Sequence, residues 1–273
     1  MSIYKDRKNL EVPARSLAEV HALVDDSRTT GNGWHLRATQ YPTGDVEILA
    51  INLDYETSLK RGGGGKRKVS DKTAMDETTL KKSQYRSKKT VYQKILTLNA
   101  DTLLTLTYRE NQENLDLAWK HFRAFNKLMK KRYRDWQYVC VPERQKRGAI
   151  HFHLAIKGQY HWNTVRRFWK QAIQGEGNVD FRRRKDNGKY ITNPRRIARY
   201  LAKYLTKQDM VEFNKRRYSS SKIELPEPIT GWLALGVPVF KIMREIIERT
   251  TRLPPRVLWE SEDVFLPMAL MRT

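Results

Sequence analysis

The sequence contains a single cysteine, Cys140, and no long run of apolar residues. One cysteine cannot form an intramolecular disulfide, and it excludes any zinc finger that is built on several cysteines. The longest apolar stretch, residues 232–240, is interrupted by a glycine and a proline and is far shorter than the ~20 residues of a membrane-spanning helix. The N-terminal stretch MSIYKDRKNLEV lacks the apolar core of a signal peptide. We therefore expect a reduced, cytoplasmic protein without a membrane segment.

Acidic residues are also scarce. The chain has 30 Asp and Glu against 53 Lys and Arg, which gives a formal net charge of +23. A surface with this charge attracts polyanions, of which nucleic acid is the commonest. Apolar residues make up 39% of the chain and aromatic residues 10%, which is enough to build a folded core. The composition favours a folded protein that binds nucleic acid.

A change of composition divides the chain. Residues 60–89 contain four consecutive glycines and many Lys and Arg but almost no apolar residues. This is typical of a flexible basic linker, or of a loop that orders on a phosphate backbone. The segment before it, residues 1–59, predicts a small α/β unit. The expected elements of that unit are a helix at 16–24 and two strands at 34–41 and 45–55.

The segment at 90–208 alternates strand-like and helix-like patterns and forms the main predicted domain. That order predicts an α+β fold in which helices pack on an antiparallel sheet. Residues 209–273 predict a C-terminal helical extension, whose one clear helix includes residues 239–247. The expected elements of the main domain are strands at 102–108, 136–143, 149–157 and 178–184, and helices in the later half of 81–98 and at 114–133, 164–173 and 194–207.

The strand AIHFHLAI at 149–156 is the most informative stretch of the sequence. Because side chains alternate in a strand, His151 and His153 share one face and the large apolar residues share the other. The partner strand of the expected hairpin ends at Glu143, whose carboxylate can reach the histidines. Two imidazoles and a carboxylate with open positions suit Mg²⁺ or Mn²⁺. The alternative is that the two histidines are ordinary surface residues.

A second pattern lies in RYLAKYLTK at 199–207. Residues four apart are neighbours on a helix, so Tyr200 and Tyr204 share a face with Lys203 and Lys207 beside them. Lysines next to a phenol favour its anion and can hold a phosphate. The alternative is an ordinary amphipathic helix whose tyrosines lie at the rim of the core.

Taken together, these residues resemble the HUH endonucleases, named for histidine-hydrophobic-histidine. Within them the chain is similar to rolling-circle replication initiators of the gene II type of filamentous phages. The stretch LLTLT at 103–107 resembles the first motif of the family, ERQKRGAIHFH at 143–153 the second, and YLAKY at 200–204 the third. The resemblance covers roughly residues 75–208.

The resemblance implies a central five-stranded antiparallel sheet that carries a divalent metal, Mg²⁺ or Mn²⁺, held by Glu143, His151 and His153. A tyrosine would attack the scissile phosphate, forming a 5′-phosphotyrosine link and a free 3′-OH. The implied partners are single-stranded or supercoiled origin DNA and the host helicase and DNA polymerase. If a phage encodes the chain, the implied location is the host cytoplasm.

Basic side chains near these motifs are candidates for contacts with the DNA backbone. They include Arg182, Arg183 and Arg184 at the end of the strand at 178–184, and Arg196 and Arg199 on the tyrosine helix. A solvated basic surface is the simpler explanation for any one of them. Two other functions also fit the sequence, namely a catalytically silent origin-binding or repressor protein and a transposase that uses the same chemistry.

Overall fold

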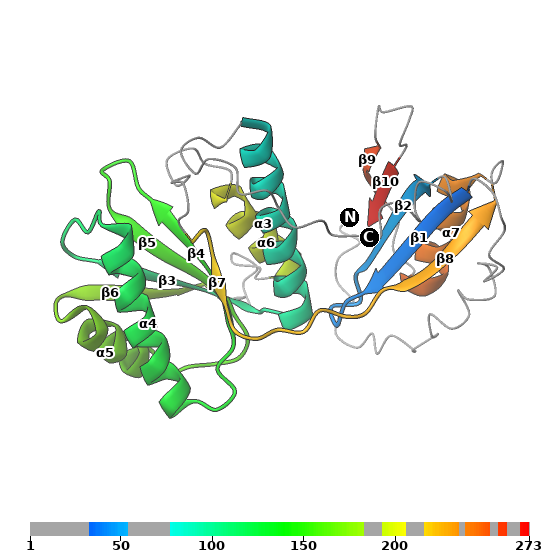
Figure 1. Ribbon diagram of the computed structural model, residues 1–273. Coiled ribbons are helices and arrows are strands. Elements are labelled where there is room, and N and C mark those ends of the chain that lie inside the picture. The colour runs from blue at the N-terminus through cyan, green and yellow to red at the C-terminus, as the bar shows by residue number, and fades with distance from the viewer. Residues whose placement is uncertain are drawn as a thin grey trace, which may run out of the picture. The chain divides into compact units, whose positions relative to one another are not determined.

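The computed structural model describes residues 33–53, 77–182, 193–205, 216–234, 238–251, 256–260 and 268–272. The chain divides into two compact units, Val69–Leu225 and a unit formed by Met1–Lys68 with Pro226–Thr273. Each unit contains a five-stranded sheet in which the paired strands are antiparallel (Figure 1). The predicted α+β class is therefore confirmed.

The sheet of the larger unit has the strand order β6-β3-β5-β4-β7. A tight turn joins β4 to β5, and Gly148 adopts a positive φ of 90° in this turn. Such a backbone is strained for residues other than glycine. The predicted hairpin is confirmed. The strands are β3 (Thr102–Tyr108), β4 (Tyr138–Arg144), β5 (Ile150–Ile156), β6 (Gly177–Arg182) and β7 (Ser219–Ser220).

Helices cover both faces of this sheet (Figure 1). On one face, α4 (Leu115–Arg132) and α5 (Trp162–Ile173) bury an aromatic-rich core against the even-numbered residues of β5, such as Phe152. On the other face, α3 (Glu77–Leu98) and α6 (Pro194–Tyr204) pack against odd-numbered residues such as Ala155. The alternation predicted for β5 is confirmed, and both histidines lie on the face covered by α3 and α6.

The α6 helix begins as its sequence predicts. The side chain of Asn193 accepts a hydrogen bond from the backbone N–H of Arg195 at 2.8 Å, and Pro194 occupies the first turn, where its missing N–H costs nothing. The α3 helix, in contrast, begins at Glu77, inside the stretch that the sequence predicts as a basic linker. Residues 77–89 are helical although few are apolar, so no hydrophobic stripe marks them in the sequence.

The second unit contains β1 (Gly33–Gln40) and β2 (Val46–Leu53), which confirm the two predicted N-terminal strands. The predicted helix at 16–24 lies outside the described residues. The C-terminal part contributes α7 (Val239–Thr251), as expected, but it also contributes β8 (Ile229–Ala234), β9 (Arg256–Glu260) and β10 (Met268–Arg272).

These C-terminal strands join the N-terminal ones in the order β8-β1-β2-β10-β9. The segments at 1–59 and 209–273, which the sequence treats as separate, therefore contribute to one sheet. A pairing between strands so far apart in the chain has no local signature. None of the helices that the structure describes is both long and apolar enough to cross a bilayer.

Candidate active site

The two histidines and Glu143 lie together on neighbouring strands of the larger unit. Glu143 on β4 is paired directly with His151 on β5, and Val141 is paired with His153. Directly paired residues of antiparallel strands point to the same face. Only 9% of His151 and 5% of His153 is exposed, because α6 packs over this part of β5. The alternative that they are ordinary surface residues is therefore excluded.

Both ring nitrogens of His153 have partners. Nε2 lies 2.7 Å from Oε2 of Glu143, and Nδ1 lies 3.2 Å from the hydroxyl of Thr105 on β3. With its proton on Nε2, the ring donates to the carboxylate and accepts from the hydroxyl. Thr105 is a site residue that the sequence does not single out. Its only signal is its place in the first motif, because the β3–β5 register that pairs it with His153 is not readable from the sequence.

His151, unlike His153, has a ring nitrogen without a hydrogen-bond partner. Its Nε2 atom is buried without a hydrogen-bond partner. The pKa of this imidazole is lowered to about 4, chiefly by burial and also by the neighbouring His153 and Arg147, whereas Glu143 partly opposes the shift. The ring is therefore neutral near pH 7 and presents an unshared lone pair, which is the form that binds a metal ion.

The tyrosines of α6 pack against His153. The Tyr204 ring stacks on His153 with centroids 4.8 Å apart and planes 9° apart. Tyr200 meets His153 edge-on at 5.6 Å and meets Tyr204 edge-on at 5.1 Å. Tyr204 is buried, with 3% exposed, whereas Tyr200 is half-buried. The two phenol rings therefore lie next to His153 rather than only at the rim of the core.

Lys203 lies over both phenol rings, with its Nζ 4.6 Å from the Tyr200 centroid and 5.0 Å from that of Tyr204. These are contacts of the cation with the faces of the rings. Burial raises the pKa of the Tyr204 hydroxyl well above its ordinary value, and the hydrogen bond and charge of Tyr200 and the Glu143 carboxylate raise it further. Tyr204 is therefore a neutral phenol at pH 7.

Residues 101–209 match the family model of the replication-associated proteins of the ORF2 and gene II protein type. The match extends from β3 to the end of α6 and so includes all three motifs. It confirms the resemblance to gene II-type replication-associated proteins for this part of the chain. No curated protein and no solved structure matches the chain.

The predicted metal ligands are adjacent, but they do not surround a common point. In the described ranges, no three His, Cys, Asp or Glu side chains are arranged to hold a metal ion. Glu143 instead contacts His153 directly. The donor types still fit a divalent cation, since a neutral imidazole with an unpaired Nε2 lies beside a second imidazole and a carboxylate. For His153 to bind an ion through Nε2, its hydrogen bond to Glu143 has to break and its proton has to move to Nδ1, which then donates to the Thr105 hydroxyl.

The predicted DNA-binding arginines are not part of this cluster. Arg196 and Arg199 are exposed on α6. Arg182, at the end of β6, forms an ion pair with Asp180 of its own strand at 3.0 Å. Arg183, Arg184 and Lys207 lie outside the described residues.

Proposed function

We propose that the protein initiates rolling-circle replication by nicking and rejoining single-stranded DNA at an origin. The observation that carries the proposal is the packing of Tyr200 and Tyr204 around His153, the residue that also contacts Glu143. Two phenolic nucleophiles next to a histidine and a carboxylate suit phosphoryl transfer better than structural packing alone. The family match of residues 101–209 supports a role in replication.

The proposed reaction is a transesterification at a phosphodiester. A phenolic oxygen forms a bond to phosphorus, and the bond from phosphorus to the 3′ oxygen breaks. The phenol gives up its proton and the departing 3′ oxygen takes one up, so charge and atoms balance. The 5′ phosphate stays on the tyrosine, and the free 3′-OH can prime a host polymerase. Because the phosphodiester energy is kept in the covalent link, the reverse reaction rejoins strands without ATP.

The residues proposed to hold a divalent cation are Glu143, His151 and His153. A bound Mg²⁺ or Mn²⁺ would supply positive charge that polarises the scissile phosphate. The neutral His151 ring with its unpaired Nε2 supports this assignment. Thr105 would hold the second nitrogen of His153 and so fix the orientation of its ring.

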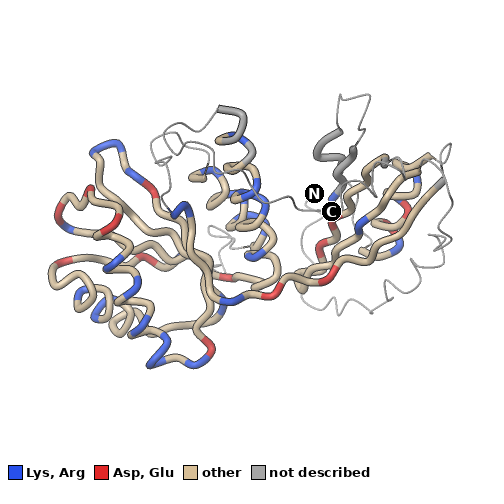
Figure 2. The backbone as a smooth tube through the Cα atoms, in the orientation of Figure 1, with Lys and Arg blue, Asp and Glu red and all other residues tan. Residues whose placement is uncertain are grey.

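The remaining proposed roles are electrostatic. In the larger unit, Lys and Arg lie along α3 and α6 and at the tip of the β4–β5 hairpin (Figure 2). Arg196 and Arg199, which are exposed on α6, would hold phosphates of a strand that reaches the tyrosines. Lys203 would stabilise charge on the phosphate that reacts. The proposed partners are origin DNA and, after nicking, the host helicase and polymerase.

Covalent trapping tests the proposal directly. The full chain is incubated with Mn²⁺ and labelled single-stranded DNA from the replicon that encodes it, and adducts that survive denaturation are mapped by peptide sequencing. We expect an adduct on Tyr200 or Tyr204 that chelation prevents. For the variants Tyr200→Phe and Tyr204→Phe, the matched control is Tyr92→Phe, because Tyr92 is also partly buried against the apolar cluster of α3 and α6.

Two results would contradict the proposal. Tight binding of the same DNA without any adduct would identify a catalytically silent origin-binding protein. An adduct on a residue outside the α6 helix would show that the tyrosine pair is not the nucleophile.

A further inference from the structure

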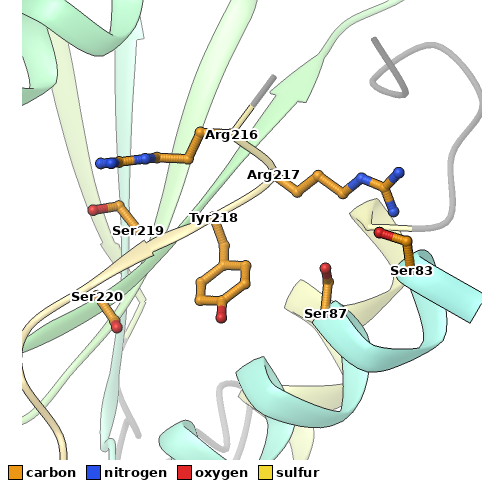
Figure 3. Close-up of a pocket in the computed structure, with 7 residues that line it drawn as sticks. All are labelled: Ser83, Ser87, Arg216, Arg217, Tyr218, Ser219 and Ser220. Carbon is orange, nitrogen blue, oxygen red and sulfur yellow. The ribbon is translucent and has the colours of Figure 1, made fainter. Parts of the chain in front are cut away.

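A polar cleft of about 500 Å³ lies in the larger unit between α3 and the segment that leads into β7 (Figure 3). Ser83 and Ser87 of α3 line one side of it, and residues 216–220 line the other. The residues that line the cleft include two arginines and four serines but no carboxylate. Hydroxyl and guanidinium groups are hydrogen-bond donors. The cleft therefore has donors for an anion and no carboxylate lining it that would repel one.

Arg217 is the most informative residue of this cleft. Its side chain extends toward Ser83, whereas Arg216 extends away on the other side of the segment (Figure 3). The Nη1 atom of Arg217 is buried and has no hydrogen-bond partner, and burial lowers the pKa of the guanidinium. A buried donor without an acceptor costs free energy. Arg217 also lines the cleft, and its guanidinium has further N–H donors for an anion bound there.

The serines add directed donors. Ser83 and Ser87 are one helical turn apart, so their side chains lie on the same face of α3, and both are half-buried. Across the cleft, the hydroxyl of Ser220 accepts a hydrogen bond from Nζ of Lys94 at 2.8 Å. A hydroxyl that accepts this bond can donate its own proton to an anion, and Lys94 adds a second positive charge nearby.

The cleft lies on the face of the sheet that carries the tyrosines. Tyr218, which lines it, packs against the same apolar cluster as Tyr200 and Tyr204. β7 pairs with β4, and Ser219 and Ser220 lie opposite Cys140 and Val139 of the strand that also carries Glu143. A DNA strand that reaches the tyrosines therefore has further phosphates available to the cleft along the same face.

We propose that this cleft binds a backbone phosphate of the single-stranded DNA substrate, next to but distinct from the phosphate that is cleaved. The proposal rests on the proposed function in one respect, namely that DNA is the substrate. Arginine is suited to this role because its planar guanidinium can form two parallel hydrogen bonds with one phosphate.

The test compares two arginine variants of the full chain by their affinity for a labelled single-stranded oligonucleotide. Arg217→Ala removes the proposed phosphate contact. Arg123→Ala removes the same charge from an exposed position on α4, on the opposite face of the sheet. We expect Arg217→Ala to weaken binding about 10- to 100-fold, as for a lost charge-assisted hydrogen bond. Arg123→Ala should weaken it by no more than about threefold, as for an exposed charge.

A second measurement locates the phosphate and does not depend on the stability of one variant. Single phosphates of the oligonucleotide are replaced by neutral methylphosphonates, one position at a time. We expect the methylphosphonate at one position to weaken binding to the wild type but not binding to Arg217→Ala. The double variant Ser83→Ala/Ser87→Ala should lose part of the same effect, and thermal unfolding shows whether each variant is folded.

Equal losses in Arg217→Ala and Arg123→Ala, or the absence of such a position, would overturn the proposal. Inorganic phosphate that stabilises the wild type but not Arg217→Ala, with DNA affinity unchanged, would show that the cleft holds a small anion instead. Because these measurements follow binding and not cleavage, failure of the nicking function is recognised separately, by the lack of a covalent adduct.

Discussion

The ring of Tyr204 lies nearly parallel on the imidazole of His153, with centroids 4.8 Å apart. This contact links one proposed nucleophile to one proposed metal ligand. It also buries the phenol and places it near the Glu143 carboxylate, and both effects raise its pKa. Tyr200, one turn earlier on α6, is only half-buried. The two phenols therefore differ in exposure, although they lie on one face of one helix.

We predict that Tyr200 makes the first attack and Tyr204 the second. Tyr200→Phe should lower the yield of covalent adduct on a short oligonucleotide at least about 100-fold, as expected for the loss of a nucleophile. Tyr204→Phe should retain most of the adduct but lose strand joining, which needs one free and one loaded tyrosine. Phenylalanine keeps the ring contacts in both variants. A normal adduct in Tyr200→Phe together with none in Tyr204→Phe would reverse the assignment.

The two histidines should differ in what their loss does to stability. We predict that His151→Ala and His153→Ala both abolish metal-dependent nicking. His153→Ala should also lower the free energy of unfolding by ~1–3 kcal/mol, because it strips hydrogen bonds from Glu143 and Thr105. His151→Ala should cost less, since its Nε2 atom has no hydrogen-bond partner to leave unpaired. Urea unfolding in the presence of EDTA gives both values. Equal stability losses would contradict the assigned difference, and full nicking by the double variant would end the metal-site proposal.

Acid should destabilise the metal-free protein through His151. The pKa of this ring is lowered to about 4 in the folded state, whereas an unfolded histidine has a pKa of about 6.5. Between these values the unfolded state binds the extra proton, so stability falls as the pH falls from about 6.5 to about 4. The contribution is at most ~3 kcal/mol.

The measurement for this prediction is the free energy of unfolding between pH 4 and pH 7 in EDTA, for the wild type and for His151→Gln. The wild type should lose more stability across this window than the variant. Parallel curves for the two proteins would show that His151 does not titrate as described.

Local patterns were enough to predict much of the larger unit. The alternation along β5 placed His151 and His153 on one face, and Asn193 with Pro194 marked the start of α6. Both signals depend on a few adjacent residues, namely the alternation of side chains along a strand and the capping residues at the start of a helix. The antiparallel pairing of the strands followed from the same patterns and from the resemblance to a known family.

Features that depend on distant pairing were not readable in the same way. The contact of Thr105 with His153 requires the β3–β5 register. The sheet of the second unit requires β8 to pair with β1 and β10 to pair with β2. The stacking of Tyr204 on His153 depends on how α6 packs across the sheet, and no local pattern in the sequence determines that packing. The early turns of α3 have no apolar stripe in the sequence, because polar residues such as Ser83 and Ser87 form its half-buried side.

The net charge of +23 leads to the last prediction, which concerns salt. Each lysine or arginine that neutralises a phosphate of single-stranded DNA releases part of a counterion, so affinity falls with salt by a slope of about −0.7 per contact. With about five contacts, affinity should fall about 100-fold between roughly 50 and 200 mM salt. Fluorescence anisotropy with one labelled oligonucleotide at several salt concentrations gives the slope.

Deleting residues 60–68, a basic stretch outside the described residues, separates attraction from chemistry in the same assay. The deletion should reduce the slope and the affinity, because it removes cations that attract the strand. The yield of covalent adduct at saturating DNA should stay unchanged, because none of the residues proposed to react lies in that stretch. An affinity that does not vary with salt would contradict a backbone-dominated interface, and a loss of adduct at saturating DNA would show that the stretch does more than attract the strand.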